Sequence, residues 1–139
     1  MVNNIKLSTN GETSLMKNKI YDCVTFYNEN LHLDLRFNIL NDYVNKFVIC
    51  ESRFDHKGKE KKLNFKIQEF SKFKHKIIYL VLDKQFPDKS NPWTRQAHQR
   101  EFILENLENI SQEDYIMFSD PDEIPRPELL LNINLKKKY

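Results

Sequence analysis

The sequence predicts an α/β fold in which helices cover both faces of a mostly parallel, Rossmann-like sheet. Short runs of aliphatic, aromatic and β-branched residues recur along the chain and have the length of buried strands. These runs are almost continuously apolar, which is typical of strands covered on both faces. Segments with the apolar spacing of helices separate the runs, and this alternation indicates parallel strands joined by crossover helices.

The expected strands and helices follow one another in order along the chain. Each expected strand is an apolar run, and the runs cover residues 19–26, 46–51, 76–82 and 115–118. Helical spacing predicts a helix over 31–44, a weaker amphipathic segment over 62–73 and a long helix over 93–109. A last helix is expected to begin at Pro127, because proline is tolerated in the first turn of a helix.

The length of the chain indicates its domain organisation. With 139 residues it is long enough for one domain with a sizeable core. We interpret the polar residues 1–18 as a flexible leader and residues 19–139 as the domain. Only one helix is expected after the acidic turn at 119–125, which leaves a small four-stranded half-sheet. We therefore expect that the chain is truncated after this turn.

Composition and charge exclude several classes of protein. A hydrophobic content of 40% and an aromatic content of 12% indicate a globular chain and not a disordered one. The net charge of +2 creates no global field that would attract nucleic acid or a membrane. The only glycines are Gly11 and Gly58, so no glycine-rich phosphate-binding loop can be written.

The cysteines and the apolar stretches indicate the cellular compartment. Cys23 and Cys50 lie inside apolar runs without metal-ligand spacing, so we expect buried, reduced thiols. The first 18 residues lack the apolar core of a signal peptide, and no later stretch is long and apolar enough to span a membrane. We therefore expect a cytoplasmic protein without a transmembrane segment.

The stretch 119–125, Ser-Asp-Pro-Asp-Glu-Ile-Pro, is the main candidate for a functional site. Proline cannot donate to a strand ladder, so the preceding strand must end near Ser119. Three carboxylates then follow at the carboxyl end of a strand, the edge at which ligands collect in open α/β sheets. A divalent cation would explain their proximity, because Mg²⁺ and Mn²⁺ prefer oxygen ligands. A solvated acidic turn that precedes a helix explains the same residues equally well.

Several motifs, in order and at similar spacing, resemble glycosyltransferase family 17, which includes the β-1,4-mannosyl-glycoprotein 4-β-N-acetylglucosaminyltransferases. The resemblance covers most of residues 19–131 and is carried by 20–29, 35–40, 46–52, Trp93, Arg95, Gln99, Arg100 and 119–127. It implies a GT-A-like fold, an inverting mechanism and a UDP-sugar donor. The implied sugar is N-acetylglucosamine, and the implied acceptor is a glycan or another saccharide.

The resemblance assigns the acidic turn to the metal. Asp120 and Asp122 match the D-x-D position, where carboxylates hold Mn²⁺ or Mg²⁺ against the donor diphosphate. Such a cation offsets the charge on the leaving UDP. Glu123 is a third candidate ligand, although a supporting position behind the ligands fits it better.

The resemblance also implies donor contacts from three other parts of the chain. Asn28 and Glu29 would face the uridine or ribose, although Asn is also a good helix cap. The other expected donor contacts are Glu51 and Ser52, the phosphate partners Arg95 and Arg100, and the stacking residue Trp93. A lone Trp is more often a core residue. Arg36 could contact phosphate or, equally, form a structural ion pair in the helix layer.

Two alternatives remain open at this point. In inverting enzymes of this fold the general base comes from the chain after the D-x-D turn, and no candidate base can be named here. The chain would then be a catalytically silent remnant that binds nucleotide sugar and metal. The second alternative is a nucleic-acid-binding module, in which lysines of segment 57–76 and the rings of Phe65, Phe70 and Phe73 would contact the polynucleotide. We favour a solvated lysine-rich face for that segment and expect no nucleic acid as partner.

Overall fold

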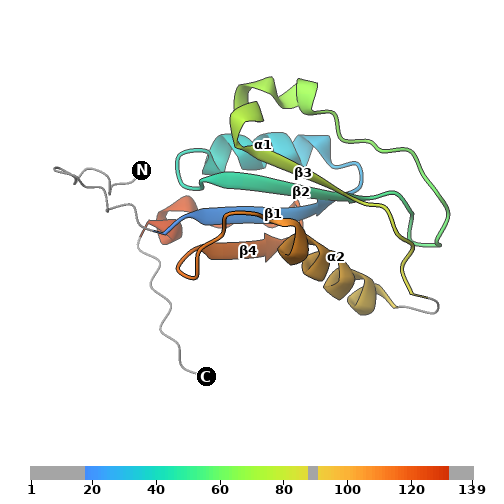
Figure 1. Ribbon diagram of the computed structural model, residues 1–139. Coiled ribbons are helices and arrows are strands. Elements are labelled where there is room, and N and C mark those ends of the chain that lie inside the picture. The colour runs from blue at the N-terminus through green and yellow to red at the C-terminus, as the bar shows by residue number, and fades with distance from the viewer. Residues whose placement is uncertain (1–17, 88–90, 132–139) are drawn as a thin grey trace.

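The computed structural model describes residues 18–87 and 91–131 and confirms the α/β class. Its sheet has the strand order β3-β2-β1-β4, and each neighbouring pair is parallel. The strands are β1 (Ile20–Phe26), β2 (Lys46–Ser52), β3 (Ile77–Leu82) and β4 (Tyr115–Ser119). All four therefore end at the same edge of the sheet, which Figure 1 shows at the ends of the arrows.

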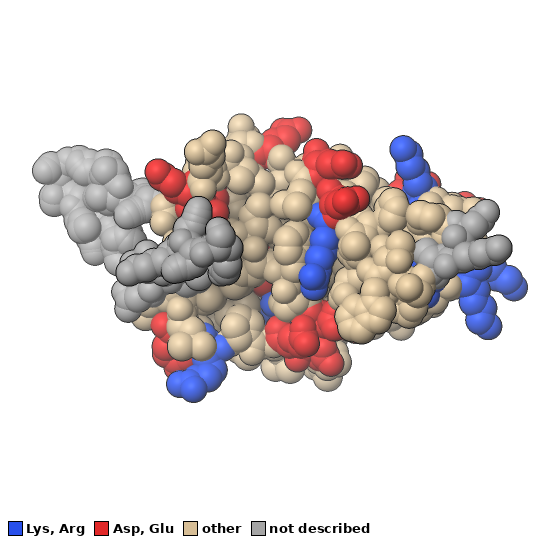
Figure 2. Space-filling view, turned by 90° about the horizontal axis from the view of Figure 1, so that it is seen from below, with Lys and Arg blue, Asp and Glu red and all other residues tan. Residues whose placement is uncertain are grey.

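Helices cover both faces of the sheet, as the sequence predicts. Helix α1 (Asn30–Leu40) and the 3₁₀ segment η3 (Ile67–Lys76) lie above the sheet in Figure 1, and α2 (Pro92–Asn106) lies below it. A short 3₁₀ turn, η4 (Pro127–Leu130), follows the acidic turn. Figure 2 looks at the molecule from below and shows small, separate groups of acidic and basic side chains on a largely uncharged surface.

Each face of the sheet has its own core. Between the sheet and α1 the core is rich in aromatic rings, and Phe37 contacts Phe47, Phe70 and Phe73 at centroid distances of 4.6, 5.1 and 5.4 Å. The opposite core packs Ile103 of α2 against residues of the strands, which include Tyr21, Cys23, Val48, Cys50 and Leu82. Alternate residues of β1 and β2 serve the two cores, as the period of a strand requires.

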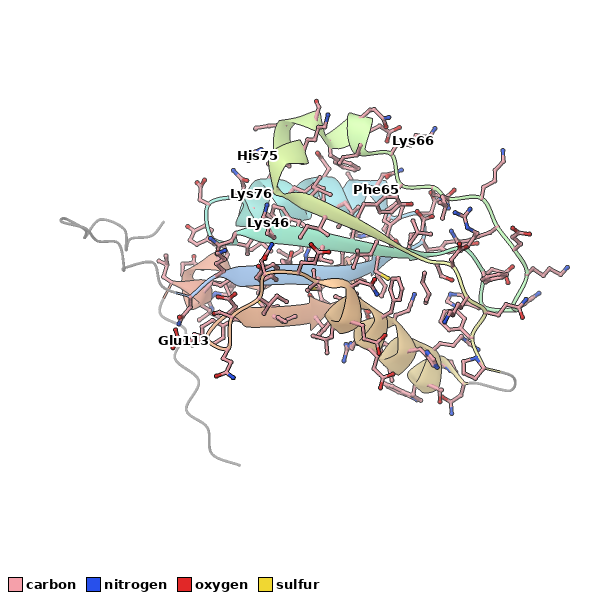
Figure 3. The ribbon with its side chains drawn as sticks, viewed as in Figure 1. Lys46, Phe65, Lys66, His75, Lys76 and Glu113 are labelled. Atoms are coloured by element: carbon pink, nitrogen blue, oxygen red, sulfur yellow. The ribbon has the colours of Figure 1, made fainter. Side chains whose placement is uncertain are left out.

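The prediction that the first helix continues to Val44 is wrong. Helix α1 ends at Leu40, and residues 41–43 form a turn in which the Tyr43 N–H donates to the Leu40 carbonyl at 2.9 Å. The chain must turn here to enter β2, and the Asn45 N–H already bonds the Ile20 carbonyl of β1. Lys76 holds this turn, because its ammonium donates to the carbonyls of Asn41 and Val44; Figure 3 labels Lys76.

Two other helix predictions need correction. Helix α2 ends at Asn106 and not at residue 109, because Leu107 is extended and Asn109 has a φ of 61°. The expected helix from Pro127 is a single 3₁₀ turn within the described residues. Its N–H groups bond carbonyls three residues back. The expected leader lies outside the described residues, apart from residue 18.

The two cysteines are buried and free, as predicted. Burial, together with the neighbouring Glu51 carboxylate, raises the pKa of Cys50 to about 12, and burial also raises the pKa of Cys23 far above its ordinary value. Since the thiolate is the reactive form, we expect Ellman's reagent at pH 8 to modify neither thiol in the folded protein. Both thiols should react at once in guanidinium chloride. Rapid modification of either thiol without denaturant would contradict the burial described here.

Candidate functional site

A cavity of about 550 Å³ opens at the carboxyl edge of the sheet. Its walls come from four segments that lie far apart in the sequence. These are the turn after β1, the loop after β2, the start of α2 and the acidic turn after β4. Because β1 lies between β2 and β4, the loop after β2 and the acidic turn lie on opposite sides of the β1 turn.

The acidic turn presents two carboxylates to the cavity. Asp120 and Asp122 are exposed and line it, and the buried Pro121 between them also contributes to the wall. Glu123 does not line the cavity. Its carboxylate accepts a hydrogen bond from the Asp120 N–H at 3.0 Å, and its own N–H donates to the Asp120 carbonyl at 2.9 Å. Glu123 therefore closes the turn, which agrees with a supporting position.

A buried arginine lies behind the acidic turn. Arg36 of α1 forms an ion pair with Asp22 of β1, in which Nε and the carboxylate oxygen are 2.7 Å apart. Its remaining N–H groups reach the turn, including the Glu123 carbonyl at 2.7 Å. The structure thus confirms the interpretation of Arg36 as a structural ion-pair partner.

The donor set at the acidic turn decides what kind of metal site it can be. Among the described residues, no group of three histidine, cysteine, aspartate or glutamate side chains could by itself hold a metal ion. Two aspartates on a cavity wall nevertheless fit Mg²⁺ or Mn²⁺, which are often bound by one or two carboxylates together with substrate phosphates and water. The residues therefore suit a cation that arrives with a phosphate ligand, and not a resident structural metal.

The structure places Glu29 and Ser52 at the cavity, but it places Asn28 elsewhere. The Glu29 carboxylate lines the cavity and accepts hydrogen bonds from the N–H groups of Tyr27 and Asn28, at 2.9 and 3.1 Å. It stands at the start of α1 without capping that helix through its side chain. Asn28 lines a second hollow with Lys62 and Lys66.

Glu51 lies inside the wall and not on its surface. The side chain is fully buried and accepts hydrogen bonds from the Lys61 ammonium at 2.7 Å and the Tyr79 hydroxyl at 2.8 Å. The N–H groups of Asn64 and Phe65 donate to the same carboxylate at 2.6 and 3.0 Å. Burial alone would raise the pKa of Glu51, but these hydrogen bonds together hold it below its ordinary value. Glu51 therefore organises the loop that carries Lys61.

Helix α2 brings two of its three candidates to the cavity. Trp93 is 78% exposed and lines the cavity, so the alternative of a core tryptophan is wrong. Arg95 also lines the cavity, two residues further into the helix. Arg100 does not line the cavity, because its guanidinium lies over the ring of Phe118 at 5.3 Å from the centroid.

The sequence alone did not single out the aromatic and basic wall of the cavity. Tyr27 stacks on His56 with a centroid distance of 6.1 Å and an interplanar angle of 20°, and the Lys61 ammonium lies 5.2 Å from the Tyr27 centroid. All three side chains line the cavity. The available signal was the position of Tyr27, directly after the apolar run of β1.

The lysine-rich segment 57–76 does not present stacking rings to a polynucleotide. Phe65, Phe70 and Phe73 are buried in the core beneath η3, with exposed fractions of 6%, 5% and 3%. Stacking on bases requires exposed faces. The interpretation of this segment as a nucleic-acid module therefore loses the aromatic contacts on which it depended.

The fold and the cavity together define an α/β domain of the Rossmann-like class with a cavity at the carboxyl edge of its parallel sheet. The sequence model described as Glycosyltransferase family 17 matches residues 4–137. The chain therefore belongs to glycosyltransferase family 17.

Three curated relatives carry the name Beta-1,4-mannosyl-glycoprotein 4-beta-N-acetylglucosaminyltransferase. Over 113 residues the chain is 33% identical to those of Homo sapiens and Rattus norvegicus and 32% identical to that of Mus musculus. Each match covers 74% of this chain and 21% of the relative, so the chain spans about a fifth of the length of these relatives. No solved structure matches the chain significantly. In residues 18–87 and 91–131, no helix combines the length and the apolar character that crossing a membrane requires.

Proposed function

We propose that the chain forms the donor-binding part of a metal-assisted, inverting glycosyltransferase that moves a sugar from a UDP-sugar to a glycan or another saccharide. The observation that carries this proposal is the pair Asp120 and Asp122, exposed at a cavity on the carboxyl edge of the sheet. Ligands of open α/β sheets collect at this edge. Membership of glycosyltransferase family 17 supports the class of reaction.

The acidic turn would hold Mn²⁺ or Mg²⁺ through Asp120 and Asp122. Such a cation offsets negative charge on the diphosphate as it leaves. Glu123 would keep the two aspartates in place, because its carboxylate accepts a hydrogen bond from the Asp120 N–H and does not line the cavity. These separate roles of the aspartates and Glu123 fit a site in which two side chains bind the ion and the sugar donor supplies further oxygen ligands.

The cavity wall formed by Tyr27, His56 and Lys61 is where we place the nucleoside of the donor. Tyr27 is 46% exposed, and its ring and that of His56 offer planar surfaces on which a uracil base could stack. Lys61, which pairs with the buried Glu51, lies beside this aromatic pair and lines the cavity. Arg95 and Trp93 would face the donor from α2. Ser52 and Glu29 complete the polar lining.

The relatives supply the sugar in this proposal. Their name describes the transfer of N-acetylglucosamine, so we take UDP-N-acetylglucosamine as the donor. A second candidate function is nucleotide-sugar and metal binding without transfer. It is kept because no general base can be named among the described residues. Turnover of UDP-N-acetylglucosamine by the chain would separate the two candidates.

Titration calorimetry of the wild-type protein with UDP tests the proposal. We expect UDP to bind at least about tenfold more tightly with Mn²⁺ than with EDTA, because the cation would bridge the aspartates and the diphosphate. Mn²⁺ without nucleotide should bind weakly, since no three-ligand cluster occurs among the described residues. UDP-N-acetylglucosamine should behave as UDP does. Equal affinity for UDP with and without Mn²⁺ would contradict the proposed metal site.

A further inference from the structure

We propose that Arg36 is a positioning residue, which holds the acidic turn in the geometry that presents Asp120 and Asp122 to the cavity. The inference rests on the proposed function, because it assigns a structural cause to the metal site. Arg36 touches neither the cavity nor the expected ligand. It would act through the backbone of the turn.

The guanidinium is first fixed from the side of the sheet. Both oxygens of the Asp22 carboxylate accept hydrogen bonds from Arg36, at 2.7 Å from Nε and 2.8 Å from Nη2. The two side chains have exposed fractions of 0% and 1%. A bidentate pair of this kind leaves the planar guanidinium one orientation.

The same guanidinium then contacts four of the five residues 119–123. Nη1 donates to the carbonyl of Glu123 at 2.7 Å and lies 3.2 and 3.4 Å from the carbonyls of Asp120 and Pro121. Nη2 also donates to the Ser119 hydroxyl, where β4 ends. One side chain thus joins β1, through Asp22, to the backbone of the acidic turn.

The composition of the turn explains why it needs this partner. Proline has no N–H, and positions 121, 125 and 127 are proline, so the segment has more backbone acceptors than donors. Carbonyls that face the interior would destabilise the folded protein if they remained unpaired. Arg36 supplies the missing donors. The carbonyls therefore point inward, while the carboxylates of Asp120 and Asp122 remain at the cavity.

The geometry matters more than the charge. Asp22 neutralises the guanidinium, so the buried pair adds little net field at the turn. A lysine at position 36 would keep the positive charge, but a single ammonium group cannot bond both Asp22 oxygens and the turn carbonyls. Arg36→Lys therefore separates positioning from charge.

The test compares four proteins: wild type, Arg36→Lys, Ser119→Ala and the control Arg126→Lys. Arg126 is exposed and follows the turn without lining the cavity, which makes it a matched arginine substitution. Ser119→Ala keeps the buried ion pair and removes one contact between Arg36 and the turn. It therefore tests the proposal even if Arg36→Lys does not fold. Each protein is checked for a cooperative thermal transition. The dissociation constant for UDP is then measured in EDTA and in Mn²⁺.

The measured quantity is the dissociation constant for UDP in EDTA divided by the dissociation constant in Mn²⁺. We expect this ratio to fall about tenfold in Arg36→Lys and about threefold in Ser119→Ala, while UDP affinity in EDTA and both values of Arg126→Lys remain unchanged. A general loss of folded protein would weaken binding equally with and without Mn²⁺ and would leave the ratio unchanged. A wild-type ratio in folded Ser119→Ala and Arg36→Lys would overturn the inference.

Amide hydrogen exchange separates this failure from failure of the proposed function. Faster exchange in residues 119–124 of both variants, without change in β1, would support the role of Arg36 in holding the turn. Wild-type protein that binds UDP equally in EDTA and Mn²⁺ would overturn the proposed metal site. Unchanged exchange in the turn of both variants would overturn the positioning role, whatever UDP does.

Discussion

Asp122→Asn is expected to remove the metal-dependent part of UDP binding. The substitution keeps the size of the side chain but replaces an anionic oxygen ligand by a neutral amide, which binds Mn²⁺ or Mg²⁺ far more weakly. Loss of groups that only support metal ligands typically reduces metal affinity 10- to 100-fold. We therefore expect UDP affinity in Mn²⁺ to fall at least about tenfold, to the value measured in EDTA, because this direct ligand is lost. Calorimetry in Mn²⁺ and in EDTA measures the effect.

The paired substitution Asp120→Asn should give a similar loss, because both aspartates line the same cavity. Glu128→Gln is the matched control. Glu128 is exposed in η4, carries the same charge and lies outside the cavity lining. Its affinity for UDP should equal that of the wild type. If Asp122→Asn kept wild-type affinity for UDP in Mn²⁺, the acidic turn would be a solvated turn and no metal site.

The central strands β1 and β2 could be predicted from the sequence because nearly every residue of each is buried. Such strands appear as continuous apolar runs, and the run 46–51 corresponds to β2 within one residue. The end of α1 could not be read in the same way. Apolar residues continue at helical spacing to Val44, but the path into β2 ends the helix at Leu40. Tertiary geometry overrides local spacing at that point.

The candidate site was predictable in its position and less so in its details. Proline and the carboxyl end of an apolar run located Asp120 and Asp122 correctly at an edge where ligands collect. The buried ion pair behind them requires knowledge of which face each residue occupies. The available signals were Asp22 inside an apolar strand and Arg36 on the same helical face as Leu33 and Phe37.

Glu51→Gln is expected to lower the free energy of unfolding by about 3 kcal/mol. Breaking a buried ion pair leaves the other charge without compensation and typically costs about 3–5 kcal/mol. The lower end applies here, because the Lys61 side chain retains 11% of its exposure and can recover some water. The glutamine amide would also direct its NH₂ group toward the N–H of either Asn64 or Phe65, because these two donors bond different carboxylate oxygens. Urea unfolding at pH 7 measures the change.

The difference in unfolding free energy between wild type and Glu51→Gln should depend on pH, and the sign follows from the pKa of Glu51. The pKa of Glu51 is held below its ordinary value of 4.5 in the folded protein. A lowered pKa means that the stabilisation is fully present above pH 4.5 and is lost as the pH falls through the folded-state value. Glutamine does not titrate in this range. The unfolding free energies of wild type and Glu51→Gln should therefore converge as the pH is lowered below 4.5.

Glu60→Gln is the control for this prediction, because Glu60 is exposed on the same loop and the described structure gives its carboxylate no buried partner. Its stability should differ from that of the wild type by less than about 0.5 kcal/mol. Glu51→Gln should also weaken UDP binding in EDTA, since Glu51 holds Lys61 and the loop beside Tyr27. The Mn²⁺ ratio should remain as in the wild type, because the acidic turn lies beyond β1. A fall in that ratio would show that the two walls of the cavity do not act independently. A free energy of unfolding equal to that of the wild type at pH 7 would show that Glu51 does not organise the loop.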